Sequence, residues 1–374
     1  MLRKPAILVL ADGTTFEGIS VGAEGHCVGE LVFNTAMTGY QEMMTDPSYA
    51  RQIVLLTTAH VGNTGCNLED MESSRIWASG MVMRECTIVP SNYRSEQSLP
   101  DWLIKHGVVA IAGVDTRQLT LLLREKGAIN ACISTEVNVE KALKLAKSFS
   151  GLNNLDLAKV VSRQTVERWH EGRGEWALHS NPLKYNVVAY DFGIKHSILR
   201  ILFDLGCHIT LVPANTTAEQ ALSYNPDGIL LANGPGDPKA CDYAIAAIKE
   251  FLKKDIPLFG ICLGFQLIGL ACGARTTKMK FGHHGANHPV QEVRGSRRVF
   301  ITSQNHGFTI AEESLPDTLQ ITHRSLFDQS LQGIQHKEKP VFAFQGHPEA
   351  APGPHDIEGI FEQFIQSMAE RSHS

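Results

Sequence analysis

The chain has 374 residues, of which 43% are hydrophobic, 20% charged and 7% aromatic, and its formal net charge at pH 7 is −5. A length above ~300 residues favours two domains over one core. The acidic balance excludes the basic surface typical of nucleic-acid-binding proteins, and no apolar run approaches the ~20 residues of a membrane span. We therefore expect neither a nucleic-acid nor a membrane partner.

The cysteines and the N-terminus indicate a cytoplasmic protein. Eight cysteines are scattered without a C-x-x-C pair, which favours neither a disulfide framework nor a zinc site, and free thiols suit a reducing cytoplasm. The opening MLRKPAILVLADG has basic residues before an apolar run, as a signal peptide does. The run stops at Asp12-Gly13, a pair typical of hairpin turns, so we interpret it as a strand followed by a turn.

Residues 1–150 are predicted to form a β-rich α/β domain. AILVLADGTTFEGISVG has the pattern strand, turn, strand, and ELVFNT, RQIVLLTT and GMVMRECTIV are further β-rich runs. A helix is predicted over residues 116–126, with Asp115 or Thr116 as its N-cap and Gly127 as its stop. A second helix is predicted over residues 139–149.

Residues 151–185 are predicted to be a connector. Hydrophobic periodicity fades there, and polar residues mix with scattered aromatic side chains. We expect this segment to pack on the surface of the molecule.

Residues 186–374 are predicted to form an α/β domain with a mainly parallel sheet flanked by helices. The β-rich runs NVVAYDFG, CHITLVPA, GILLANG and PLFGI alternate with helical runs such as KHSILRILFDLG and YAIAAIKEFLKKD. This alternation is typical of right-handed crossovers between parallel strands. The final DIEGIFEQFIQSM indicates a docked terminal helix with five apolar side chains on one stripe, namely Ile357, Ile360, Phe361, Phe364 and Met368.

Three chemically distinctive segments follow predicted strands of this sheet. They are NGPGDP at residues 233–238, GICLG at residues 260–264 and QGHPEA at residues 345–350. Ligands of parallel sheets bind beyond the carboxyl ends of the strands, so we expect these segments to meet at one site.

GICLG has the pattern of a nucleophile elbow with cysteine as the nucleophile. Gly260 and Gly264 leave room where side chains would clash, and the tight turn points the thiol of Cys262 into the crevice. The N-terminus of the following helix favours thiolate, and the backbone N–H of Leu263 could hold an oxyanion. The alternative that Cys262 is a buried filler thiol stays open on this segment alone.

GHPEA supplies a candidate base and its orienting group. In an extended segment His347 and Glu349 point to the same side, and Pro348 stiffens the link between them. A cysteine nucleophile needs such a base, which Glu349 would hold in one tautomer. We therefore predict a triad of Cys262, His347 and Glu349.

Two other segments are polar but predict no cofactor. NGPGDP is a glycine-rich turn without the G-K-[ST] of a phosphate loop, so it suits a second oxyanion donor or a clamp on a small substrate. GHHGANH, residues 282–288, matches no standard zinc spacing, and we interpret it as a polar loop held by hydrogen bonds. No metal site is predicted, and no ATP motif is present in the sequence.

Together, these segments resemble the class I, or triad, glutamine amidotransferases, in which G-x-C-x-G-x-Q precedes GHPEA. In that family a cysteine attacks the side-chain amide of glutamine, releases ammonia and leaves a glutamyl thioester that water hydrolyses. GELVFNTAMTGYQEMMTDPSY, GVDTRQLTLLLREKGA, VVAYDFGIKHSILRIL, NGPGDPKACDYAI, KMKFGHHGANHPV and TSQNHGF further resemble the small, glutamine-hydrolysing chains of carbamoyl-phosphate synthase. The likeness spans nearly the whole chain.

The resemblance implies roles for individual residues. Cys262 matches the nucleophile, His347 the general acid and base, and Glu349 its orienting partner. The matched glutamine-binding positions are Ser48, Gly234, Gly236, Leu263, Gln266, Asn305, Gly307 and Phe308. Ser48 would reach the site from the N-terminal domain. The chain departs from the family at Phe265, where C-L-G-H-Q has histidine, and we expect a drier environment around Gln266.

The resemblance also implies a partner. In the family, ammonia passes through a tunnel to a large chain that binds ATP and Mg²⁺ and makes carbamoyl phosphate for arginine and pyrimidine synthesis. Three alternatives are kept: a glutaminase component of another synthase, a free γ-glutamyl hydrolase, and a non-catalytic regulatory subunit. The N-terminal half argues against the first two, and the intact triad argues against the third.

Overall fold

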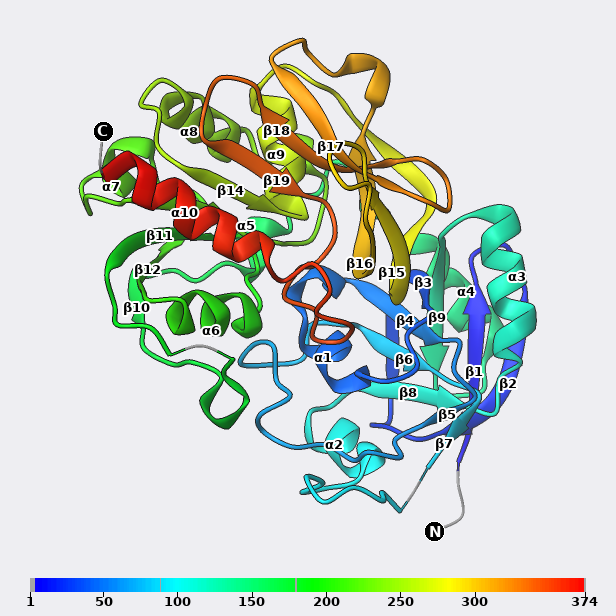
Figure 1. Cartoon of the computed structure of the whole chain (residues 1–374). Coiled ribbons are helices and arrows are strands. Elements are labelled where there is room, and N and C mark those ends of the chain that lie inside the picture. The colour runs from blue at the N-terminus through cyan, green and yellow to red at the C-terminus, as the bar shows by residue number, and fades with distance from the viewer. Residues whose placement is uncertain (1–3, 88, 179, 373–374) are drawn as a thin grey trace. The chain divides into compact units, whose positions relative to one another are not determined.

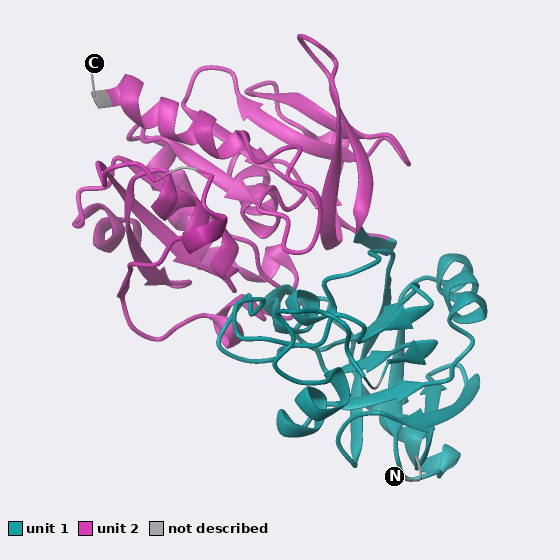
Figure 2. Cartoon of the chain, turned by 60° about the horizontal axis from the view of Figure 1, so that its bottom comes forward, with its two compact units in different colours: residues 1–153, 280–285 teal, residues 154–279, 286–374 magenta. Residues whose placement is uncertain are grey.

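The computed structural model describes residues 4–87, 89–178 and 180–372. The chain folds into two compact units (Figure 2). The first unit comprises residues 1–153 and 280–285, and the second comprises residues 154–279 and 286–374. The polypeptide therefore crosses from one unit to the other three times. Across the described residues, every helix is too short or too polar to cross a bilayer.

The first unit is built on a closed barrel with the strand order β1-β2-β8-β6-β4-β3-β9. The strands are β1 (Pro5–Leu10), β2 (Thr15–Ser20), β3 (His26–Asn34), β4 (Gln52–Leu56), β6 (Gly80–Val82), β8 (Val109–Ala112) and β9 (Ile129–Ser134). A separate small sheet pairs β5 (His60–Val61) with β7 (Glu85–Cys86). The helices are α1 (Tyr40–Thr45), the 3₁₀ helix η1 (Pro47–Tyr49), α2 (Leu99–Lys105), α3 (Thr116–Lys126) and α4 (Val139–Ser148).

Strand β1 shows why the barrel strands are almost continuously apolar. Leu8 and Leu10 belong to a core cluster shared with other barrel strands and α3, whereas Ile7 and Val9 pack with Ala142 of α4. Successive side chains of a strand point to opposite faces, so a strand with both faces covered needs apolar residues throughout.

Helix α3 has the predicted bounds. The side chain of its N-cap, Asp115, accepts a hydrogen bond from the N–H of Gln118, and the helix ends at Gly127 with φ 95°. A carboxylate satisfies N–H groups that have no acceptor within the helix, and glycine adopts positive φ without steric strain. The predicted N-cap and stop are both confirmed.

The second unit contains a ten-stranded sheet with the order β10-β12-β11-β13-β14-β19-β18-β17-β15-β16. Its strands are β10 (Glu167–Trp169), β11 (Tyr185–Asp191), β12 (Cys207–Pro213), β13 (Gly228–Leu231), β14 (Leu258–Ile261), β15 (Thr276–Glu292), β16 (Val299–Ile310), β17 (Leu319–Ser325), β18 (Leu331–His336) and β19 (Val341–Phe344). Neighbours from β12 through β11, β13 and β14 to β19 run parallel.

Helices cover both faces of the parallel part of this sheet (Figure 1). One apolar cluster joins the sheet to α7, α8 and α9, and another joins it to α6 and α10. The helices are α5 (Ala158–Val161), α6 (His196–Asp204), α7 (Ala218–Leu222), α8 (Asp242–Leu252), α9 (Leu263–Ala271) and α10 (Ile360–Ser372), with 3₁₀ helices η2 (Gly174–Trp176), η3 (Pro238–Ala240) and η4 (Glu312–Ser314). The predicted α/β fold with helices flanking a sheet is confirmed, but the sheet is mixed rather than mainly parallel. Strand β10 pairs antiparallel with β12, and β19, β18, β17 and β15 pair antiparallel with one another.

Two local predictions were wrong. Residues 282–288 do not form a polar loop but lie within strand β15, and His283, His284 and His288 are buried. The polar composition of residues 282–288 favours a loop, whereas pairing with other parts of the fold stabilises them as a strand. The terminal helix begins at Ile360, so Ile357 contributes to the apolar packing from the segment before it.

Candidate active site

The distinctive segments of the second unit follow adjacent parallel strands. Strand β11 leads into residues 192–195, β13 into residues 232–238, β14 into Cys262 and β19 into residues 345–350. Their carboxyl ends share one edge of the sheet, which is where parallel sheets bind ligands. The edge is therefore assembled from four segments that are distant in sequence.

Cys262 lies on a strained turn between β14 and α9. Its φ is 53° and its ψ is −99°, and its N–H donates a hydrogen bond of 2.9 Å to the carbonyl of Phe344. Such a conformation costs on the order of 1–3 kcal/mol in a non-glycine residue and persists only where the surroundings impose it. The strain presents the side chain at the start of α9.

Two glycines make this turn sterically accessible. A Cβ atom on Gly260 would lie 2.7 Å from the backbone of Gly264, and one on Gly264 would lie 2.0 Å from the carbonyl oxygen of Leu231. Both separations are shorter than real Cβ contacts. The elbow therefore packs its backbone directly against the neighbouring strand.

His347 and Glu349 form a buried hydrogen-bonded pair. Nδ1 of His347 lies 2.7 Å from Oε1 of Glu349, and each residue is only 1% exposed. A carboxylate accepts, so Nδ1 carries a proton and Nε2 is the ring atom that can exchange a proton with another group. Nε2 is therefore the ring atom left for the thiol of Cys262, which interacts with this imidazole.

Lys195 joins this pair, and sequence analysis missed it. Its Nζ lies 2.9 Å from Oε1 of Glu349 and 2.6 Å from the carbonyl of Ala350, and it is 2% exposed. Its position after DFGI at the end of a buried strand was the available signal. A buried lysine at such an edge needs an anionic partner, and here the fold supplies Glu349.

Charges close to His347 and Glu349 shift the pKa values of both side chains. Burial raises the pKa of the Glu349 carboxyl, but Lys195 and His347 outweigh burial and lower the pKa to about 2. Burial lowers the pKa of the His347 imidazole, but Glu349 and Cys262 outweigh it and raise the pKa to about 10. Glu349 is therefore an anion at neutral pH, and the imidazole of His347 beside the thiol keeps at neutral pH a proton that its Nε2 takes up.

The thiol itself lies against β16. Sγ of Cys262 lies 3.6 Å from the carbonyl oxygen of Asn305, to which the S–H can donate. The N–H of His347 donates to the carbonyl of Ser303, also on β16, at 2.8 Å. Strand β16 thus holds both the thiol and the segment that carries the imidazole.

Gln266 is fixed by two acceptors. Its Nε2 donates to the carbonyl of Phe308 at 2.8 Å and to Oε1 of Gln345 at 3.2 Å. Both amide protons of Gln266 are therefore used within the protein, and its Oε1 is the polar atom left for another partner. Gln345 was not predicted, although it directly precedes GHPEA.

The comparisons with known proteins agree with this geometry. Residues 8–133 match the family model of the carbamoyl-phosphate synthase small chain, CPSase domain, and residues 188–367 match that of glutamine amidotransferase class-I. Carbamoyl phosphate synthase small chains of Pseudomonas aeruginosa and Pasteurella multocida are each 57% identical to this chain; the alignments cover 99% and 100% of it and 100% and 98% of those proteins. That of Thioalkalivibrio sulfidiphilus is 58% identical over 97% of each chain.

The chain belongs to the carbamoyl phosphate synthase small chain family. The resemblance drawn from its motifs is thereby confirmed.

Within this family member, three of the predicted glutamine-binding positions have clear local surroundings. A Cβ atom on Gly234 would lie 2.2 Å from the carbonyl of Phe192 and 3.0 Å from Leu263, so this glycine lies next to the elbow. Gly236, with φ 95°, approaches the carbonyl of Leu155 instead. Gly307 on β16 has open space around its Cβ position.

Phe265, the departure from the C-L-G-H-Q pattern, points into the protein. It is fully buried and belongs to the apolar cluster that joins α9 to the sheet, with Ile268 and Ile310. The substitution therefore adds apolar packing under the elbow.

Ser48 belongs to the first unit. It lies in η1, where its N–H donates to Oδ1 of Asp46 at 2.8 Å, and it is 9% exposed. Its predicted role in binding glutamine stays a prediction.

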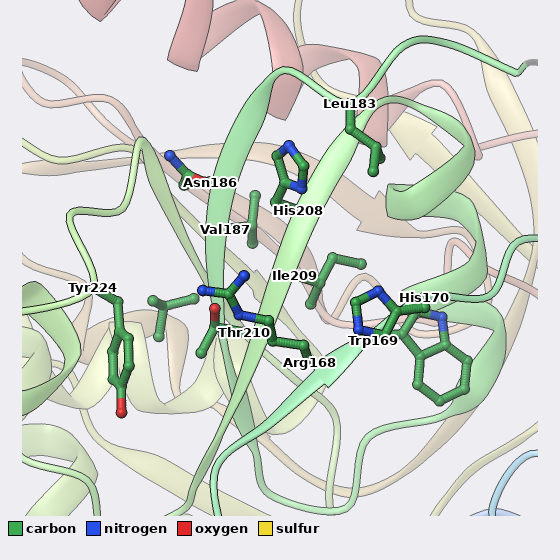
Figure 3. A pocket seen from close by; sticks show the side chains of 11 residues that line it. Arg168, Trp169, His170, Leu183, Asn186, Val187, His208, Ile209, Thr210 and Tyr224 are labelled. Atoms are coloured by element: carbon green, nitrogen blue, oxygen red, sulfur yellow. The ribbon is translucent and has the colours of Figure 1, made fainter.

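A cavity of about 270 Å³ lies elsewhere in the second unit (Figure 3). It is lined by Arg168, His170, Asn186, His208 and Tyr224 among others, and by none of the predicted site residues. It lies along the first residues of β11 and β12, away from the strand ends that carry the predicted triad.

Proposed function

We propose that this chain is the glutaminase subunit of a glutamine-hydrolysing carbamoyl-phosphate synthase, with Cys262, His347 and Glu349 as its catalytic triad. The observation that supports it best is the strained, buried Cys262 beside an imidazole whose Nδ1 is held 2.7 Å from Glu349. In this proposal the three residues serve as nucleophile, base and orienting group, which are the roles that cysteine acyl transfer requires.

The proposed reaction has two halves. Nε2 of His347 takes the thiol proton, the thiolate of Cys262 attacks the side-chain amide carbon, and the imidazolium returns a proton to the departing ammonia. Water then loses a proton to His347 and attacks the thioester, which releases glutamate and restores the thiol. Both tetrahedral intermediates carry an oxyanion, for which the N–H of Leu263 and the Gly234 loop are the proposed donors.

Glutamine itself would be held by backbone and polar side-chain groups. We propose Gln266 of α9 and Asn305, Gly307 and Phe308 of β16 as such groups. The Oε1 of Gln266 suits a donor on the substrate, because both of its amide protons are already bound. The remaining proposed positions are Ser48, Gly234, Gly236 and Leu263.

The partner of this chain is proposed to be the carbamoyl-phosphate synthase large chain. The relatives are named small chains, and a small chain implies a larger one. The ammonia would be delivered to that chain, which would bind ATP and Mg²⁺ and make carbamoyl phosphate from bicarbonate for arginine and pyrimidine synthesis in the cytoplasm. We also propose that residues 1–150 form the partner-contacting domain, 151–185 the connector and 186–374 the amidotransferase domain.

The test is glutamate release from glutamine by the purified chain, alone and with the large chain, ATP and bicarbonate. We expect release to rise with the large chain, together with carbamoyl phosphate, and to disappear in Cys262→Ala. Release that persists in Cys262→Ala would contradict the nucleophile, and release that ignores the large chain would contradict the partner.

A further inference from the structure

Two arginines of the predicted connector, whose residues 154–185 belong to the second unit, bind aspartates of that unit with the same geometry. The backbone N–H and Nε of Arg163 both donate to Oδ2 of Asp191, at 3.0 and 2.9 Å. The backbone N–H and Nε of Arg173 both donate to Oδ2 of Asp204, at 3.2 and 3.1 Å. The two aspartate side chains are equally buried, each 7% exposed.

The two ion pairs differ in what they hold. Asp191 is the last residue of β11, and its Oδ1 accepts hydrogen bonds of 2.9 Å from the N–H groups of Gly193 and Ile194. These residues lead directly to Lys195, whose Nζ binds Glu349. Arg163 thus contacts Asp191, the carboxylate that holds the turn immediately before Lys195.

The second ion pair, between Arg173 and Asp204, is not connected by hydrogen bonds to the proposed site within the described part of the chain. Asp204 is the last residue of α6, and Arg173 also donates to Glu358 at 2.8 Å, ahead of α10. Neither carboxylate forms a hydrogen bond with a residue of the proposed site in the described part of the chain. This pair fixes the connector to the helices but not to the catalytic edge.

The start of the connector contacts a second loop of the site. The N–H of Asn154 donates to Oδ2 of Asp237 at 3.1 Å, and the N–H of Asp237 donates to the carbonyl of Leu155 at 3.1 Å. The same carbonyl is the atom that a Cβ on Gly236 would meet at 2.6 Å. Residues 154–163 therefore bind two of the four segments that form the catalytic edge.

We propose that Arg163 is a positioning residue for glutamine hydrolysis, which acts through Asp191 and the 192–195 turn to place Lys195 against Glu349. This inference rests on the proposed function. A largely buried arginine–aspartate pair holds its geometry because each charge would otherwise be left desolvated without a partner. Small displacements of a catalytic group reduce rate strongly, so a turn that is slightly misplaced is enough to slow the reaction.

The contacts of residues 154–163 begin at the sequence position where the chain passes from the first unit to the second. Residue 154 follows directly on residue 153 of the first unit, and the ion pair with Asp191 forms nine residues later. A change in the path of the connector would reach Lys195 through one ion pair and two backbone hydrogen bonds. In this proposal the connector helps to position Lys195 as well as joining the two units.

The test compares Arg163→Gln with Arg173→Gln, a matched control from the same segment, and with the conservative Arg163→Lys. Activity is measured on the full-length chain in complex with the large chain, over a range of pH. We expect Arg163→Gln to lower kcat about tenfold with little change in KM for glutamine. Arg163→Lys should recover part of the loss, and Arg173→Gln should lower the melting temperature with kcat within about twofold of the original chain.

The pH profile separates positioning from general destabilisation. Glu349 is faced by Lys195 and His347, and both lower the pKa of its carboxyl. If Lys195 is displaced, the carboxyl is protonated at higher pH, so the acid limb of the kcat profile should move upward in Arg163→Gln and stay in place in Arg173→Gln.

A second measurement does not depend on glutamine hydrolysis. The rate at which iodoacetamide alkylates Cys262 is followed against pH in the same variants, and only Arg163→Gln should change its pH dependence. Equal effects of the two glutamine variants, or an unchanged profile in Arg163→Gln, would overturn the inference. Absence of glutamate release by the original chain would contradict the proposed function, and alkylation would still decide the inference.

Discussion

The two ends of strand β11 both lie beside polar side chains, but these side chains differ in burial and in pairing. At the carboxyl end of β11, Asp191 and Lys195 are buried and bonded to charged partners. Near the amino ends of β11 and β12, the cavity of Figure 3 is lined by the exposed Arg168, His170 and His208, which form no ion pair with any residue that the structure describes. At one end the charged groups are buried and paired with one another, and at the other end the charged groups line a cavity and are exposed.

Burial beside a charged partner therefore distinguishes the end of the sheet that carries the proposed triad from the end that carries this cavity. The pKa of Glu349 falls to about 2 and that of His347 rises to about 10 because each group faces a charge inside the protein. Strong shifts of this kind concentrate at functional sites. The comparison can be tested by changing the same residue type at the two ends.

The largest contrast is expected between two histidines. His347→Gln removes the proposed base, and the loss of one triad member lowers kcat by about 10³-fold or more. His208→Gln, near the amino end of β12, should leave glutamate release within about twofold. Glutamine turnover by the two purified variants checks this, and a comparable loss in His208→Gln would give the cavity a role that we do not assign to it.

Two cations provide the next contrast. Lys195→Met should lower kcat about 10–100-fold, because Glu349 loses the partner that keeps it anionic and correctly placed. Its carboxyl pKa then rises, so activity at low pH is lost at a higher pH than in the original chain. Arg168→Met should change neither kcat nor its pH profile. An unshifted acid limb in Lys195→Met would show that the lysine does not set the ionisation of Glu349.

A smaller effect is expected from the elbow glycine. Gly264→Ala would place a Cβ atom 2.0 Å from the carbonyl of Leu231, and relieving such a clash costs about 1–3 kcal/mol of unfolding free energy. Gly359→Ala is the control, since nothing lies within 4 Å of its Cβ position. Urea unfolding of both variants measures the difference, and equal midpoints would mean that the elbow adjusts without strain.

The smallest expected effect is a pH dependence of stability. The pKa of His347 is raised from 6.5 to about 10, so the stability that it contributes is fully present below pH 6.5 and is lost as pH rises toward 10. Between these values, the melting temperature of the original chain should fall more steeply than that of His347→Gln. Parallel curves for the two proteins would indicate that the imidazole has no raised pKa in the folded state.

Local patterns predicted those parts of the molecule in which neighbours in sequence act together. Asp115 and Gly127 mark helix α3 because capping is a local interaction. Gly260 and Gly264 enclose Cys262 within one turn, and His347 and Glu349 lie two residues apart, so their pairing could also be anticipated. These features need no knowledge of the remaining chain.

The parts that sequence did not predict depend on the fold. Lys195 and Glu349 are 154 residues apart in sequence. They meet only because β11 and β19 end at the same edge of the sheet. Arg163 and Asp191 are brought together in the same way. Residues 282–288 look like a polar loop, whereas tertiary pairing extends β15 through them. Long-range contacts between polar residues have no periodicity that a local pattern could reveal.

The six residues 280–285 have a consequence for how this chain can be divided. They belong to the first unit, where the carbonyl of Lys280 accepts from Ala128 at 2.9 Å, that of His284 accepts from Thr35 at 3.1 Å, and Phe281 lies against Phe33 with ring centroids 5.7 Å apart. A protease cut at the connector would therefore leave six residues of the first unit covalently continuous with the second. Recombination between related genes at the same point would combine residues 1–153 of one protein with residues 280–285 of another. These six residues must therefore remain compatible with a barrel whose own sequence lies more than a hundred residues earlier.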